Sequence, residues 1–63
     1  MEIKLLESYL NREGGSYIVV SYKTHKSYVI ITYRYRDFEH TGQLEVPLFY
    51  LLSFVYSEIT AKH

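Results

Sequence analysis

Three side chains that could take part in acid–base or metal chemistry lie close together: Asp37, Glu39 and His40. They could loosely cup a cation, but one His with two carboxylates lacks the ligand spacing of any specific metal site. Turns also attract Asp and His for backbone reasons. The chain has no Cys nucleophile, and its three glycines form no phosphate-binding pattern. We therefore predict an ordinary turn here and a protein that is not an enzyme, with no metal and no cofactor.

Cationic and aromatic side chains form a second candidate site in the segment Tyr28–Phe38, YVIITYRYRDF. Its strict two-residue alternation predicts a β-strand with two different faces. The apolar face carries Val29, Ile31, Tyr33 and Tyr35, and the aromatic, basic face carries Tyr28, Ile30, Thr32, Arg34 and Arg36.

The preceding segment, Ser16–Thr24, predicts a second strand that forms a hairpin with the first. If His25 and Lys26 form the tip, the predicted register pairs Tyr22 with Val29, Val20 with Ile31, and Ile18 with Tyr33. This register brings six residues to one open face of the sheet, which we predict to bind a partner: Tyr17, Lys23, Tyr28, Ile30, Arg34 and Arg36.

The remaining segments predict two helices and a third strand. Glu2–Arg12 has the apolar spacing of an amphipathic helix, which Gly14-Gly15 ends. Gln43–Val46 alternates as a short strand, and Pro47 suits the first turn of a helix over Leu48–Thr60. The predicted fold is a small α+β domain over residues 1–63, with the order helix, three-stranded antiparallel sheet, helix (αβββα).

The second predicted helix is apolar nearly all round. One stripe, which we expect to face the core, contains Leu48, Leu51, Leu52, Val55 and Ile59. A helix of this kind is normally covered on more than one side. We predict self-association through Phe49, Phe54 and Tyr56, with complete burial under the first helix as the alternative.

Length and composition also favour self-association. A chain of 63 residues buries only about 60% of the surface that its unfolded form exposes, and without Cys it has no disulfide to compensate. We therefore expect a homodimer. No signal peptide or membrane-spanning run is visible, so we expect a cytoplasmic protein without a membrane partner.

Tyr and Arg at the rim of an apolar patch are typical of protein-binding hot spots, so a protein partner is the leading hypothesis. Rings and cations interleaved on an open sheet are also typical of single-stranded nucleic-acid binding, which is the alternative. A zero net charge argues against a general electrostatic grip on nucleic acid. A structural subunit of a larger assembly would have the same sequence features.

The predicted element order is similar to that of double-stranded-RNA-binding domains, which are of about this length. The similarity is one of topology, because those domains have a basic cluster at the start of the last helix, where this chain has Glu45-Val46-Pro47-Leu48-Phe49. As a short, Cys-free and Tyr-rich chain, it resembles small regulators or inhibitors encoded by phages and mobile elements, which block a larger protein assembly by occupying its surface.

Overall fold

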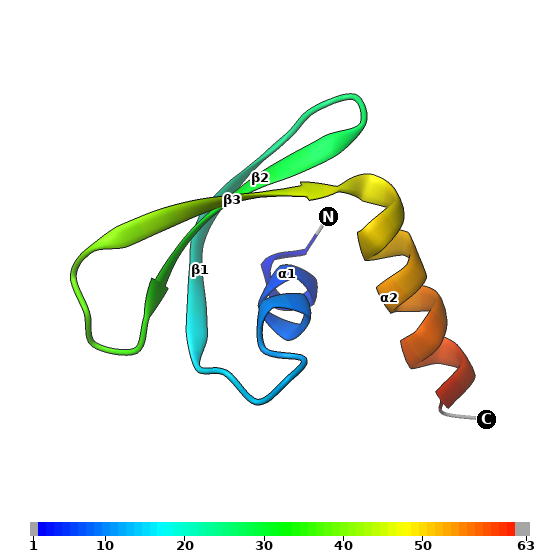
Figure 1. Cartoon of the computed structure of the whole chain (residues 1–63), viewed down its shortest axis with the longest axis horizontal. Helices are drawn as coiled ribbons and strands as arrows, with labels where there is room; N and C mark the ends of the chain where they lie inside the picture. Colours follow the sequence, from blue (N-terminus) through cyan, green and yellow to red (C-terminus); the bar gives the residue numbers. More distant parts are fainter. Residues whose placement is uncertain (1, 62–63) are drawn as a thin grey trace.

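The computed structural model describes residues 2–61, which form a helix, a three-stranded antiparallel sheet and a second helix. The predicted α+β fold and element order are confirmed. Figure 1 shows both helices on one side of the sheet, with α2 extending away from it. The elements are α1 (Ile3–Leu10), β1 (Tyr17–Thr24), β2 (Tyr28–Tyr35), β3 (Thr41–Pro47) and α2 (Leu48–Ala61).

The backbone turns after α1 and after β2. Helix α1 ends at Leu10 with Asn11 as its C-terminal cap, and Gly14, with a φ of +91° that costs glycine little, donates its N–H to the Asn11 carbonyl at 2.9 Å in the turn that follows. Strand β2 ends at Tyr35 rather than at Phe38, because Arg36 has a φ of 50° and the Phe38 N–H donates to the Tyr35 carbonyl at 3.0 Å. These features close a turn, so the predicted extent of this strand was too long.

The predicted register of the first hairpin was wrong. Tyr22 lies opposite Ile31 and Thr24 opposite Val29, and the register shifts between Val19 and Ser21. Val20 has no partner in β2, which makes it the extra residue of a β-bulge. Because an extra residue reverses the alternation of side chains, the first half of β1 presents the opposite face from the one predicted.

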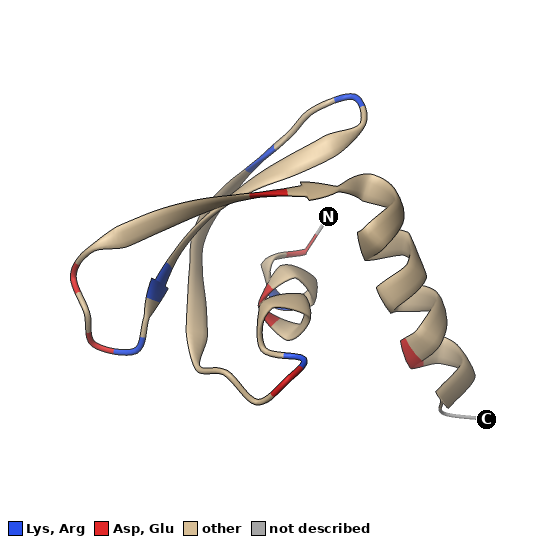
Figure 2. Cartoon of the chain, viewed as in Figure 1, with Lys and Arg blue, Asp and Glu red and all other residues tan. Residues whose placement is uncertain are grey.

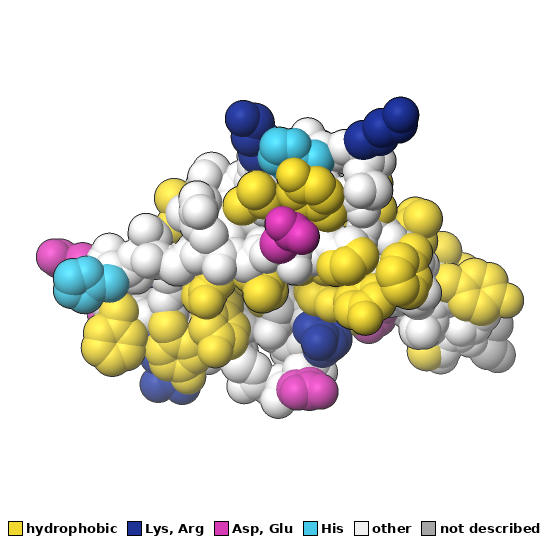
Figure 3. Space-filling model, turned by 45° about the horizontal axis from the view of Figure 1, so that its top comes forward, with side chains coloured by type: hydrophobic (Ala, Val, Ile, Leu, Met, Phe, Trp, Pro, Cys, Tyr) yellow, Lys and Arg dark blue, Asp and Glu magenta, His cyan; other side chains and the backbone are white. Residues whose placement is uncertain are grey.

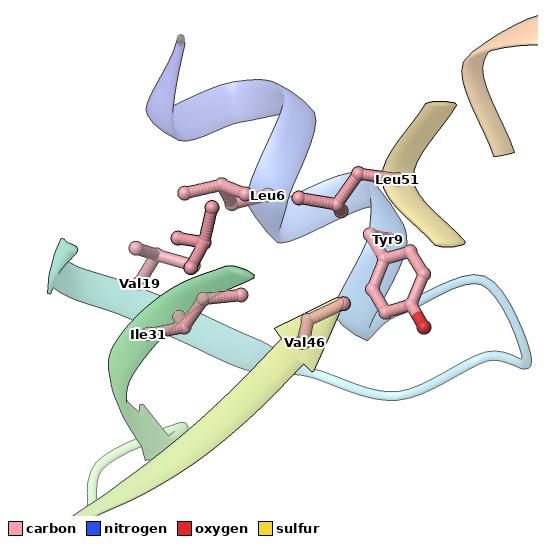
Figure 4. Close-up of a cluster of buried hydrophobic side chains, with 7 residues drawn as sticks. Leu6, Tyr9, Val19, Ile31, Val46 and Leu51 are labelled. Carbon is pink, nitrogen blue, oxygen red and sulfur yellow. The ribbon is translucent and has the colours of Figure 1, made fainter. Parts of the chain in front are cut away.

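The core consists of seven buried side chains contributed by all five elements (Figure 4). Val19 is 5% exposed and belongs to this core, whereas Val20, which was predicted to be on the apolar face, is 49% exposed. No polar or charged residue is buried among residues 2–61. The core side chains are Leu6, Tyr9, Val19, Val29, Ile31, Val46 and Leu51.

Helix α2 packs against this core through few residues. Leu51 is its one buried residue, and Leu48 and Phe54 pack partly against the core. The last turns of α2 are exposed. Within residues 2–61, neither helix has the length and apolar character that crossing a bilayer requires.

Candidate functional site

Four large apolar side chains lie exposed along one side of α2. Phe49 is 62% exposed, Leu52 68%, Tyr56 70% and Ile59 55%. They are three, four and three positions apart, the spacing that aligns side chains along one side of a helix and that recurs in coiled coils. We call these four residues the outer stripe of α2. Figure 3 shows hydrophobic side chains on the surface of the part of the molecule that α2 forms.

The outer stripe differs from the surface predicted for self-association. Phe49 and Tyr56 are exposed as predicted, but Phe54 is turned inward, with its ring edge-on to that of Tyr9 at 5.5 Å. Leu52 and Ile59, expected to face the core, are instead exposed. The apolar arc of α2 is wider than the core can cover, so composition alone did not show which part would be buried. The three-four-three spacing of the exposed residues was present in the sequence and was missed.

The second candidate surface is the sheet face opposite the helices, which we call the outer sheet face. It carries four of the six residues predicted to meet a partner: Lys23, Tyr28, Ile30 and Arg34. Lys23 lies opposite Ile30, not opposite Tyr28 as predicted. The Tyr28 ring stacks on the His25 ring at a centroid distance of 4.5 Å, so one of its faces is already covered. The Nε2 atom of His25 is buried without a hydrogen-bond partner among the described residues.

Tyr17 and Arg36, the other two predicted residues, do not lie with them. The ring of Tyr17 contacts Tyr33 at 5.4 Å and Tyr35 at 5.0 Å, both on the other face of the sheet. This is a consequence of the bulge at Val20, which reverses the first half of β1. Arg36 lies in the turn after β2, where its guanidinium is 5.3 Å from the centre of the Tyr35 ring and its carbonyl accepts a hydrogen bond from Arg34.

Tyr17, Tyr33 and Tyr35 therefore form an aromatic cluster on the helix side of the sheet, which Phe38 extends through a ring contact with Tyr35 at 6.2 Å. The Tyr33 ring lies over Gly42, so close that an added Cβ would be 2.9 Å from it. The alternation in the sequence placed Tyr33 and Tyr35 on the apolar face of β2 but did not predict that Tyr17 would lie beside them.

Asp37, Glu39 and His40 are exposed in the connection between β2 and β3. Within the part of the chain that the structure describes, no group of three His, Asp or Glu side chains could hold a metal ion. The remaining candidate sites are the exposed surfaces formed by α2 and by the sheet.

No family model, no curated protein and no solved structure matches this chain.

Proposed function

We propose that this protein is a non-catalytic protein-binding domain that acts as a homodimer, with the two copies paired through the outer stripe of α2. The observation that carries the proposal is the exposure of Phe49, Leu52, Tyr56 and Ile59 along one side of a single helix. By analogy with small proteins of this size, the dimer would act as a regulator or inhibitor that occupies the surface of a partner protein.

The exposed area of the stripe, if it is all buried, approaches the area of the smallest specific interfaces. A fully exposed aromatic side chain offers roughly 150–250 Å², so at the observed exposures the four residues offer on the order of 500 Å² per copy. Two copies would bury about 1,000 Å², the lower bound for a specific interface. Pairing would also cover the last turns of α2, which the monomer leaves in solvent.

The charge distribution favours a second copy as the occupant of this stripe. Glu58 is the only charged residue within Leu48–Ala61, and it is not part of the stripe. Figure 2 shows this single acidic position on α2. In a two-fold dimer the same surface meets itself, so a charge on the stripe would face its own copy. An uncharged stripe avoids that repulsion.

The proposal is tested by placing a charge in the stripe. Leu52→Glu and Tyr56→Glu should each reduce the mass in solution from a dimer to the 7.5 kDa of one chain. Ser57→Glu is the matched control, because it adds the same charge to the same helix at an exposed position next to Tyr56 but on a different side. Loss of the dimer in the Ser57 variant alone, or an unchanged mass in both stripe variants, would contradict the proposal.

The outer sheet face supports a protein partner more than a nucleic acid. Lys23, Tyr28 and Arg34 share this face, which is the feature in favour of nucleic acid, but Tyr17 and Arg36 lie elsewhere and the Tyr28 ring is stacked on His25. If single-stranded nucleic acid is the ligand, a labelled oligonucleotide should bind at about 50 mM salt and lose affinity steeply as salt rises. Lys23→Ala combined with Arg34→Ala should then abolish binding, because these are the two basic residues of the outer sheet face that the structure retains from the prediction.

A further inference from the structure

The sheet has two edge strands, β1 and β3, and their outward backbone groups differ in whether side chains bond to them. At the β1 edge, the Asn11 side-chain amide donates to the Tyr17 carbonyl at 3.0 Å and its oxygen accepts from the Tyr17 N–H at 2.7 Å. The Glu7 carboxylate accepts from the Val19 N–H at 3.1 Å. Side chains from the helical layer thus satisfy three outward backbone groups in the first half of β1, the N–H and carbonyl of Tyr17 and the N–H of Val19. An incoming strand would find this part of the edge occupied.

The β3 edge is open, and the hydrogen-bond pattern shows which of its residues face outward. The Leu48 N–H donates to the Ser27 carbonyl at 3.0 Å, which extends the β2–β3 register by one pair. Bonded pairs alternate along an antiparallel ladder, so the backbone groups of β3 that face β2 belong to Gly42, Leu44 and Val46. The backbone groups that point away from the sheet belong to Thr41, Gln43, Glu45 and Pro47.

The first hairpin gives the same result independently. The His25 N–H donates to the Tyr28 carbonyl at 2.8 Å, and the Arg36 N–H donates to the Ser16 carbonyl at 3.1 Å. The even-numbered residues of β2 therefore face β1 and its odd-numbered residues face β3, as the β3 pattern requires. Pro47, which has no N–H, occupies an outward position, where proline is tolerated on an edge strand.

Little protects this edge from pairing. The β2–β3 register is continuous over seven pairs, without a bulge. Thr41, Gln43 and Glu45 are all exposed, and Glu45 is the one charged residue within Thr41–Pro47. Natural edge strands are commonly protected by bulges, several charges or a covering segment. No strand covers β3 within residues 2–61.

The surroundings of the edge define the side chains that an added strand would carry. On the helix side, Leu44 is 40% exposed and lines an open pocket of about 370 Å³, which Leu10 and Tyr33 share with the charged residues Arg12 and Glu13. On the outer face, the residues next to an added strand would be Thr41, Gln43 and Glu45. An apolar side chain would therefore suit the position beside Leu44, and a basic side chain would suit the position beside Glu45.

We infer that the β3 edge is a docking site for an extended segment of the partner protein, added antiparallel as a fourth strand with an apolar residue beside Leu44 on its helix side and a basic residue beside Glu45 on its outer side. This inference rests on the proposed function, because it specifies how the partner is held. A second copy is a poorer occupant, because β3 itself carries no basic residue to place opposite Glu45.

The probe is a short synthetic peptide of alternating valine and lysine, compared with two N-methylated forms. In antiparallel pairing, residues directly opposite each other share a face, so lysine amides should bond to Gln43 and its outward neighbours. Methylating the lysine amides should weaken binding at least about tenfold, whereas methylating the valine amides should leave it unchanged. A peptide that does not bind, or an effect independent of which amides are methylated, overturns the inference.

Variants of the protein complete the test. Gln43→Pro removes an outward N–H without removing a β2–β3 hydrogen bond and should weaken peptide binding by a similar factor, while Gln43→Ala should bind normally. The solution mass is measured on the same samples. If Gln43→Pro dissociates a dimer, a second copy occupies the edge and the inference is wrong. If the unmodified protein is monomeric but still binds the peptide through the lysine amides, the α2 dimer fails while the docking site stands.

Discussion

Asn11 is the residue that ties the helical layer to the sheet most directly by polar contacts. It follows α1 as the C-terminal capping residue, and its side chain makes two hydrogen bonds to the backbone of Tyr17. Glu7, one helical turn earlier, bonds to Val19 from the same side of the helix. In the sequence, Glu7 and Asn11 are four residues apart and directly follow Leu6 and Leu10, which places them on one side of the helix. This spacing does not show that the two polar side chains reach the edge of a strand.

Replacing Asn11 should therefore weaken the fold. Asn11→Ala removes two hydrogen bonds and leaves the Tyr17 N–H without its side-chain acceptor, so we expect a loss of about 1–2 kcal/mol in the free energy of unfolding. Urea denaturation followed by circular dichroism measures it. Ser8→Ala, an exposed change on α1, should stay within about 0.5 kcal/mol. Equal stability of the two variants would show that the Asn11 contacts do not hold β1.

At the scale of elements, β3 differs from β2, which is paired on both sides, and from the first half of β1, which bonds to Asn11 and Glu7, because one row of its backbone groups faces solvent. Amide hydrogen exchange should reveal this alternation in the free protein. We expect slow exchange at Gly42, Leu44 and Val46, whose N–H groups face β2, and exchange at least about tenfold faster at Thr41 and Gln43. Uniform protection along β3 would mean that its edge is already paired, with a second copy as the natural candidate.

The packing of α2 against the core gives a second test at this scale, which compares two neighbouring leucines. Leu51 is 2% exposed and Leu52 is 68% exposed. Leu51→Ala should reduce the free energy of unfolding by about 2–5 kcal/mol, enough to unfold much of so small a domain. Leu52→Ala should change it by less than about 0.5 kcal/mol, measured at protein concentrations low enough for monomers. A larger effect of the Leu52 change would mean that α2 is rotated from the orientation described.

The comparison of β1 with β2 shows what sequence patterns can predict. Alternation in β2 continues through eight residues, and its inward residues Val29 and Ile31 were predicted correctly. In β1 the same reasoning failed at one point, the bulge at Val20, and the error moved Tyr17 to the wrong face. A bulge depends on how two strands fit together and leaves no clear signal in either strand alone. For α2 the sequence predicted an excess of apolar surface but not its position.

At the scale of the whole molecule, residues 2–61 form a flat body of 38 × 28 × 16 Å and contribute only seven buried side chains to the core. More large apolar side chains are exposed than buried, and those of α2 lie on a helix with little contact to the rest of the fold. A domain of this size gains stability when a second molecule covers such a surface. Self-association through α2 is therefore the central claim.

Sedimentation equilibrium of the unmodified protein over a series of concentrations tests this claim most directly. We expect the mass to approach twice the 7.5 kDa of one chain at tens of micromolar, roughly the range of weak association, and to fall toward 7.5 kDa on dilution. A mass of 7.5 kDa at every concentration, up to about 1 mM, would contradict the claim, because the outer stripe of α2 would then stay uncovered by a second copy.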